Sequence, residues 1–137
     1  MTPEECMTIY GQAWFEPDHA QRVEILRRCC TEDIRFADAG ALYNGLDEVS
    51  GMIGATRSSV AGAQGSSASA TGRSGGGVSV EVTTPIETFG PFFRYSFVWH
   101  MPDGSFGGTD FGEFAEDGRM KVITVWGASR HFPVPGV

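Results

Sequence analysis

The sequence predicts one α+β domain in which three N-terminal helices cover one side of a curved antiparallel sheet. Two observations lead to this fold class. Apolar residues recur at helical spacing in most of the chain up to Gly54, whereas β-branched and aromatic runs separated by turn residues follow Gly77. The 137 residues suffice for one hydrophobic core, so we expect residues 1–137 to form a single domain.

The first helix is expected over residues 3–15, where apolar side chains recur every three or four positions. Thr2 and Glu5 have the spacing of a capping box, in which each side chain bonds the backbone N–H of the other residue. Tyr10 and Trp14 are four residues apart and therefore share one face of this helix.

A second helix is expected in the segment PDHAQRVEILRRCC, residues 17–30, with Asp18 as its N-cap. Its apolar stripe consists of Val23, Leu26 and Cys30. The segment DIRFADAG that follows predicts a short strand ending at Asp38.

A third helix is expected after the segment LYNG, with Asn44 or Asp47 as its cap. Its inward side chains are Val49, Met52 and Ile53. Residues 54–77 are too rich in Gly, Ser and Ala to bury much apolar surface, so they predict a frayed helix end followed by a flexible loop, a linker or lid. A short strand at residues 66–71 is a second interpretation of that segment.

The rest of the chain predicts consecutive antiparallel strands. β-branched and aromatic runs are separated by one Gly-Pro and two Asp-Gly turns, at residues 78–89, 91–101, 105–115 and 119–129. Pro85 in the first run indicates a bulge or an edge position, because proline donates no hydrogen bond to a ladder.

The second run is the most regular of these strands. Large apolar side chains occupy alternate positions, which are Phe93, Tyr95, Phe97, Trp99 and Met101. The intervening positions include Arg94, Ser96 and His100. One face of this strand is therefore an aromatic wall that lines a core or a pocket, and the other is expected to meet solvent or a second subunit.

The composition excludes several classes of function. A formal charge of -7 disfavours nucleic acid and anionic membranes as partners. The acidic N-terminus is unlike a signal peptide, so we expect a cytoplasmic protein whose cysteines (Cys6, Cys29 and Cys30) are reduced thiols. Neither the cysteines nor the histidines have metal-ligand spacing, so neither a metal nor another cofactor is expected.

Three stretches carry a resemblance to a known family: residues 10–38 (YGQAWFEPDHAQRVEILRRCCTEDIRFAD), 92–104 (FFRYSFVWHMPDG) and 109–127 (TDFGEFAEDGRMKVITVWG). Their order and spacing resemble the nuclear transport factor 2-like (NTF2-like) superfamily, particularly SnoaL-like polyketide cyclases and ketosteroid isomerases. The resemblance implies a cone with a curved, mixed but mostly antiparallel sheet and three helices on its concave face. With one sheet face left open by the helices, we also expect a homodimer formed through that face.

The same resemblance implies a cofactor-free acid/base enzyme that cyclises, isomerises or dehydrates a hydrophobic carbonyl compound. By position in the family pattern, Asp38 matches the general base, Asp110 a protonated or acid/base aspartate, and Tyr10 the oxyanion-hole tyrosine. The substrate would contact the aromatic residues Trp14, Tyr43, Phe93, Tyr95, Phe97 and Trp99.

Chemistry supports a division of roles between two carboxyl groups. Proton transfer beside a carbonyl needs an ionised base and a donor that stabilises the enolate. Asp38, at a strand end, is expected to stay hydrated and ionised, whereas Asp110 would be neutral if its face is inward, because burial raises a carboxyl pKa. Gly108 and Gly112 share the parity of Asp110, and we expect them to leave room for a ligand.

Structural interpretations of the same residues remain open. Asp110 would be a solvated charge if Phe111 pointed inward, Asp38 would be a turn residue, and Tyr10 would belong to the core. The alternative function is a non-catalytic small-molecule-binding or dimerisation domain. Limonene-type epoxide hydrolysis is disfavoured because Ser96 stands where an aspartate is needed, and a scytalone dehydratase-like site because His100 has the wrong parity.

Overall fold

The computed structural model describes residues 1–38, 40–59, 79–102 and 104–127. Their helices are α1 (Pro3–Phe15), α2 (His19–Cys29) and α3 (Gly45–Ser59). Their strands are β1 (Cys30–Asp38), β2 (Ala41–Asn44), β3 (Ser79–Val82), β4 (Glu87–Phe89), β5 (Phe92–Met101), β6 (Gly104–Phe114) and β7 (Met120–Trp126). No helix in these ranges is long and apolar enough to cross a membrane.

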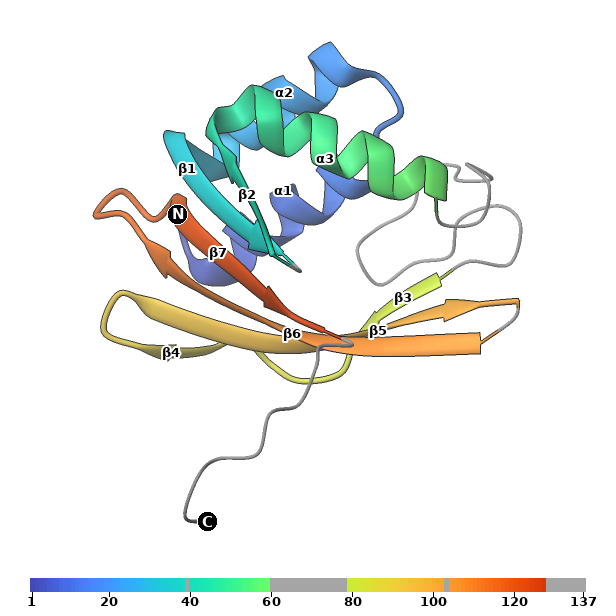
Figure 1. Cartoon of the computed structure of the whole chain (residues 1–137). Helices are drawn as coiled ribbons and strands as arrows, with labels where there is room; N and C mark the ends of the chain where they lie inside the picture. The colour runs from blue at the N-terminus through green and yellow to red at the C-terminus, as the bar shows by residue number, and fades with distance from the viewer. Residues whose placement is uncertain (39, 60–78, 103, 128–137) are drawn as a thin grey trace.

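The seven strands form one sheet in the order β2-β1-β7-β6-β5-β3, with β4 also paired to β5. β1 and β7 are parallel, whereas every other pair is antiparallel. The sheet is curved, and the three helices lie together on one side of it (Figure 1). The prediction of an α+β fold with a curved, mixed sheet and helices on its concave face is confirmed.

The capping box predicted for α1 is present. The Glu5 N–H donates to Thr2 Oγ1 at 3.1 Å, and the Thr2 N–H donates to the Glu5 carboxylate at 2.7 Å. Asp18 caps α2, and its carboxylate accepts from the Gln21 N–H at 2.8 Å. These local bonds satisfy backbone donors that a helix start leaves unpaired, so they set where each helix begins.

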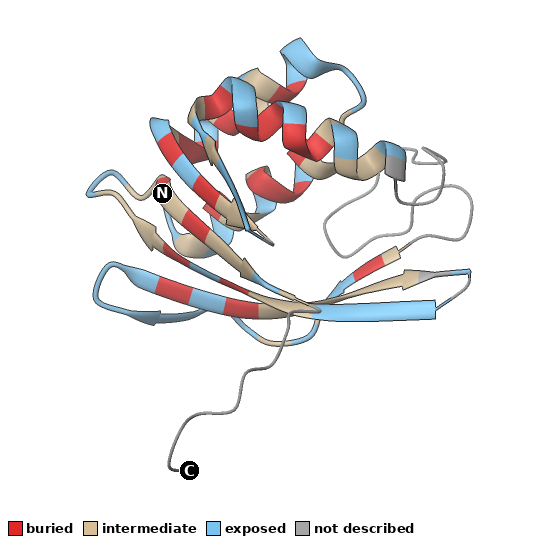
Figure 2. Cartoon of the chain, viewed as in Figure 1, coloured by how far each residue is buried: buried red, intermediate tan, exposed pale blue. Residues whose placement is uncertain are grey.

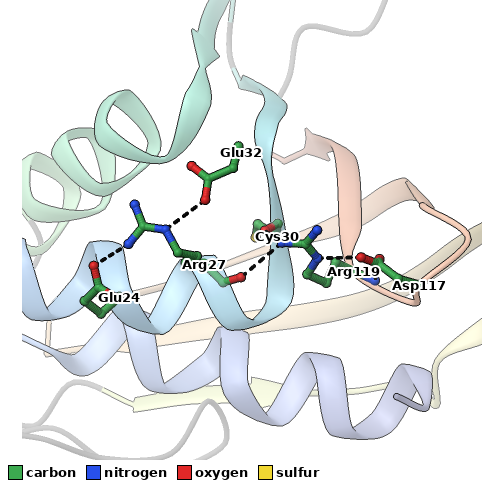
Figure 3. A network of polar contacts seen from close by, with 6 residues as sticks. All are labelled: Glu24, Arg27, Cys30, Glu32, Asp117 and Arg119. Carbon is green, nitrogen blue, oxygen red and sulfur yellow. Dashed lines mark hydrogen bonds and ion pairs between the residues drawn. The ribbon is translucent and has the colours of Figure 1, made fainter.

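The expected apolar stripe of α2 needs a correction at its end. Leu26 lies in the core as predicted, but Cys30 belongs to β1, and Cys29 is the last buried residue of the helix. Figure 3 shows polar contacts between the end of α2 and Arg119. The Arg119 guanidinium, held by Asp117, donates to the carbonyl oxygens of Arg27 and Cys30 at 3.4 and 3.5 Å. The β6–β7 turn thus caps the C-terminus of α2.

Arg22 is the feature of α2 that apolar periodicity does not predict. Its guanidinium is buried between the helices and donates to the Ser50 carbonyl and hydroxyl oxygens at 3.1 and 3.0 Å. It also donates to the carbonyl oxygens of Glu16 and Pro17 at 2.8 and 3.2 Å. A buried charge is costly without such partners, so these hydrogen bonds have to form in the folded protein. They hold the α1–α2 connection against α3.

Two expectations about the strands also change. The segment LYNG, for which no strand was expected, contributes to β2, which pairs with β1 after a turn at Gly40, where φ is 89°. The run 78–89 was expected as one strand, but Pro85 lies between two short strands, β3 and β4, rather than in a bulge. α3 continues to Ser59, where a frayed helix end was expected; the flexible loop expected in the rest of 54–77 and the strand considered at 66–71 fall in residues 60–78, outside the described part of the chain.

Burial divides the sheet into two faces. Buried residues gather on the inner sides of the helices and on the face of the sheet toward them (Figure 2). Phe36, Phe93 and Ile123 anchor this core from β1, β5 and β7. The aromatic side chains expected on one face of β5 (Phe93, Tyr95, Phe97 and Trp99) face inward, and Arg94 lies exposed on the opposite face.

Candidate active site

A cavity of about 360 Å³ lies between the helices and the concave face of the sheet. This volume is within the range of small-molecule sites. Four of its lining residues carry titratable side chains: Tyr10, Asp38, Tyr95 and Asp110. Its apolar lining includes Trp14, Val80, Val82, Phe97, Trp99 and Phe106.

The sheet register explains why two distant carboxyl groups meet in this cavity. Asp38 on β1 is opposite Val125 on β7, and Val125 is opposite Asp110 on β6. Residues paired across a sheet point to the same face. With one strand between them, the Cα atoms of Asp38 and Asp110 are separated by about 10 Å.

The same register gives the cavity a polar end and an apolar end. Tyr95 lies opposite Asp110, whereas Trp99 lies opposite Phe106 and Val80. Tyr95 and Trp99 are four positions apart, which corresponds to about 13 Å along a strand. A bound molecule can therefore place one polar atom at Asp110 and extend its apolar part toward Trp99.

Asp110 is inward and only 5% exposed, whereas the next residue, Phe111, is 47% exposed on the other face. Its Oδ2 accepts a hydrogen bond from the Tyr95 hydroxyl, but Oδ1 is buried with no partner among the described residues. Burial raises the pKa of Asp110 to about 7, the bond from Tyr95 opposes this rise, and the charge of Asp38 adds to it. Near neutral pH, both protonation states of Asp110 are populated.

Asp38 is in a different environment. It is the last residue of β1, lines the cavity and is half-buried, and this burial raises its pKa above the usual value. It lies at the strand end beside the Gly40 turn, where water reaches it more easily than Asp110. The two carboxyl groups therefore differ in solvation, which is the condition for different protonation states in one site.

Tyr10 projects from α1 into the same polar end. Its pKa is raised well above the usual value, chiefly by burial and then by the charge of Asp110. The rings of Tyr10 and Trp14 pack edge to face, with 6.3 Å between their centroids, and the centroids of Trp14 and Trp99 are 6.2 Å apart. Tyr10 is thus both a packed core residue and a lining residue of the cavity.

Of the six aromatic residues predicted to contact substrate, Trp14, Tyr95, Phe97 and Trp99 line this cavity. Phe93 and Tyr43 do not. Phe93 is 2% exposed inside the core, and Tyr43 lies in a separate shallow depression beside α3. Sequence analysis missed the apolar lining residues Val80 and Val82, although their alternation on β3 could have indicated them.

The expectation that glycines beside Asp110 leave room for a ligand is wrong. A Cβ atom at Gly112 would lie 2.5 Å from Cζ of Phe93, and one at Gly108 would lie 2.7 Å from Cζ of Phe97. The two phenylalanine rings therefore already cover the glycines. The space that the missing glycine side chains leave beside the carboxyl group is filled by these two rings and not by a ligand.

Metal coordination has no candidate in the described part of the chain, where no group of three or more His, Cys, Asp and Glu side chains is placed to hold an ion. The three cysteines, Cys6, Cys29 and Cys30, are buried and unpaired by disulfides. Burial raises the pKa of the Cys6 thiol to about 12, so this thiol stays protonated at neutral pH.

A curved mixed sheet, helices on its concave face and a cavity between them define the nuclear transport factor 2-like fold. No model of a known protein family matches the sequence, and no curated protein matches it. The evidence for the fold comes from solved structures.

Three of these structures illustrate the likeness. A proposed isomerase of the SnoaL-like family from Agrobacterium tumefaciens has a TM-score of 0.70 at 22% identity, over 92% of this chain and 97% of that one. A nuclear transport factor 2-like protein of unknown function from Exiguobacterium has a TM-score of 0.61 at 12% identity, over 94% and 100%. A proposed ketosteroid isomerase from Kribbella flavida has a TM-score of 0.58 at 16% identity, over 96% and 84%. At these identities the likeness establishes the fold alone.

Proposed function

We propose that the protein is a cofactor-free acid/base enzyme that isomerises, cyclises or dehydrates a hydrophobic carbonyl compound. One observation carries this proposal. Asp110 and Asp38 both line a largely apolar cavity, and the buried Oδ1 of Asp110 has no hydrogen-bond partner among the described residues. Unpartnered buried polar atoms are rare in folded proteins, and perturbed carboxyl groups in cavities are enriched at functional sites.

The two carboxyl groups have complementary roles in this proposal. Asp38, the better hydrated group, removes a proton from the carbon next to the substrate carbonyl. Neutral Asp110 donates a hydrogen bond to the carbonyl oxygen as negative charge develops on it, and Tyr10 is a second donor. The separation of about 10 Å between the two Cα atoms leaves room for the reacting part of a substrate between the side chains.

The shape of the cavity favours a substrate with one polar end. Its carbonyl group lies beside Asp110 and Tyr10, and its apolar rings extend along the aromatic side chains toward Trp99. Burial of that apolar surface supplies most of the binding free energy, at roughly 25 cal/mol per Å². A second polar group at the Trp99 end would weaken binding because it would lose its water partners.

Exchange of the α-hydrogens of hydrophobic ketones in deuterated water, followed by proton NMR, tests this function without knowledge of the product. The wild-type protein should accelerate exchange for at least one steroidal or polycyclic ketone. Asp38→Asn and Asp110→Asn should each lower that rate about 100-fold, because the first removes the base and the second replaces the carboxylic acid by an amide, which is a weaker donor.

Asp33→Asn is the matched control, because Asp33 is an exposed residue of the same strand as Asp38 and does not line the cavity. Quenching of tryptophan fluorescence reports binding separately, since Trp14 and Trp99 line the cavity. Ketones that bind without accelerated exchange in every case would refute the enzyme and support the alternative, a small-molecule-binding domain.

Self-association is a second proposal, carried by the sheet face that the helices leave uncovered. This outer face presents Phe89, Phe92, Phe111 and Trp126, which are 86, 44, 47 and 63% exposed. Two pairs of charges on this face are formed within the chain, since Arg94 contacts Glu87 at 2.6 Å and Lys121 contacts Glu113 at 2.8 Å. The exposed aromatic residues are apolar on both copies, so the same face of a second copy matches this face chemically.

Phe111→Glu should convert a homodimer into a monomer, because it places a charge among the exposed aromatic residues of the outer face, where a dimer would bury that charge. Analytical ultracentrifugation measures the change. Gln12→Glu adds the same charge to an exposed position on α1 and should leave the dimer intact. A wild-type protein that stays monomeric at its highest soluble concentration would contradict this proposal.

A further inference from the structure

Tyr95 and Asp110 form a polar pair inside the core. They lie directly opposite each other on β5 and β6, and both are almost fully buried, at 6 and 5% exposed. The Tyr95 hydroxyl donates a hydrogen bond to Asp110 Oδ2, whereas Oδ1 has no partner among the described residues. A buried hydroxyl needs a partner, so each of the two groups restricts the other.

The ring of Tyr95 is itself held by packing. It stacks on the ring of Phe93, with 8° between the planes and 6.5 Å between the centroids. The ring centroids of Phe93 and Phe114 are 4.5 Å apart. The Phe93 ring also lies over Gly112, where there is no side chain to displace it. The position of the Tyr95 hydroxyl is therefore fixed by a continuous row of packed groups that begins at Gly112.

We propose that Tyr95 is a positioning residue, which holds Asp110 Oδ2 so that Oδ1 and the proton of the neutral acid face the ligand. This inference rests on the proposed function, in which Asp110 is a donor. Without the bond from Tyr95, the carboxyl group could rotate and present either oxygen, and part of the neutral population would direct its proton away from the ligand.

The bond also sets the protonation state of Asp110. A hydrogen bond donated to a carboxylate stabilises the ionised form, so Tyr95 lowers the pKa that burial raises. Removal of the hydroxyl should therefore have two separable effects. The pKa of Asp110 should rise above its value of about 7, which extends the neutral form to higher pH, while the orientation of that neutral form is lost.

Two measurements on Tyr95→Phe test this inference, and neither depends on turnover. Carbon-13 NMR of the labelled aspartate carboxyl groups should show the pKa of Asp110 raised by about one unit. Calorimetric titration with 2-naphthol, a hydroxylated aromatic probe that mimics an enol, should show binding weakened about tenfold at a pH where Asp110 is neutral in both proteins. Tyr43→Phe, which changes a tyrosine outside the cavity, should alter neither value.

A second variant covers the case in which Tyr95→Phe fails to fold. Difluorotyrosine at position 95 keeps the ring and hydroxyl but makes the hydroxyl a stronger donor, and it should lower the pKa of Asp110. A folded Tyr95→Phe protein with an unchanged pKa and unchanged 2-naphthol affinity would overturn the inference. If both values shift but no ketone undergoes exchange, the positioning role stands and the proposed enzymatic function fails.

Discussion

Replacing Asp110 by asparagine is expected to remove a large part of the pH dependence of the free energy of unfolding. The pKa of Asp110 is about 7 in the folded protein, against 3.8 for an ordinary aspartate, and burial is the main cause. Between these two values the unfolded chain has lost the proton and the folded protein keeps it. The free energy of unfolding therefore falls as pH rises toward 7 and levels off above it.

The size of the effect follows from the pKa. At about 1.36 kcal/mol per pKa unit, the interval from roughly pH 5.5 to 7 corresponds to about 2 kcal/mol of stability lost by the wild-type protein. Asp110→Asn lacks this titration, so the stability of the variant should gain about 2 kcal/mol relative to wild type between roughly pH 5.5 and 8.5. Any cost of burying the amide is independent of pH and cancels in this comparison.

Urea unfolding of both proteins across this pH range measures the difference. Asp38 contributes a pH dependence of the same sign, but it is present in both proteins and also cancels. Asp33→Asn, at an exposed position, should leave the wild-type profile unchanged. Parallel profiles for wild type and Asp110→Asn would mean that Asp110 titrates normally and that the buried neutral donor does not exist.

Gly112→Ala is expected to lower the free energy of unfolding by about 3 kcal/mol, at the upper end of the usual cost of overpacking. The added Cβ would lie 2.2 Å from the Val122 carbonyl oxygen and 2.5 Å from Phe93 Cζ. The first of these atoms belongs to the backbone of β7 and cannot move without disturbing the ladder between β6 and β7. Chemical unfolding at fixed pH measures the loss.

Gly51→Ala provides a matched control. A Cβ at Gly51 meets no atom within 4 Å, and the residue is exposed within α3, so alanine should stabilise the protein by up to about 1 kcal/mol. Because Phe93 supports Tyr95, Gly112→Ala should also weaken 2-naphthol binding, whereas Gly51→Ala should not. A Gly112→Ala protein as stable as wild type would show that the row from Gly112 to Asp110 is loosely packed.

Local patterns in the sequence were sufficient to predict much of the fold. The capping residues of α1 and α2 lie within three positions of the backbone groups they bond, so the helix starts could be predicted from neighbouring residues. Alternation along β5 likewise grouped its aromatic side chains on one face. These predictions succeeded because the interactions they depend on are close in sequence.

Long-range contacts account for the failures. Apolar periodicity did not indicate that Arg22 is buried, because its partner Ser50 is 28 positions away. Cys30 was expected in the helix, and Arg119, which donates to its carbonyl oxygen, is 89 positions away. Phe93 was expected in the cavity, but Gly112 on the neighbouring strand lets its ring lie flat in the core. No local pattern carries such information.

The sequence by itself determined that Asp110 shares a strand face with Gly108 and Gly112, because side chains in a strand alternate. Only the tertiary structure decided that this face is the inside, since the choice depends on which face the helices cover. It also placed Asp38 two strands away from Asp110 by pairing β1 with β7 in parallel. The physical reason is that burial and strand register arise from contacts between segments far apart in the chain, and burial raises the pKa of Asp110.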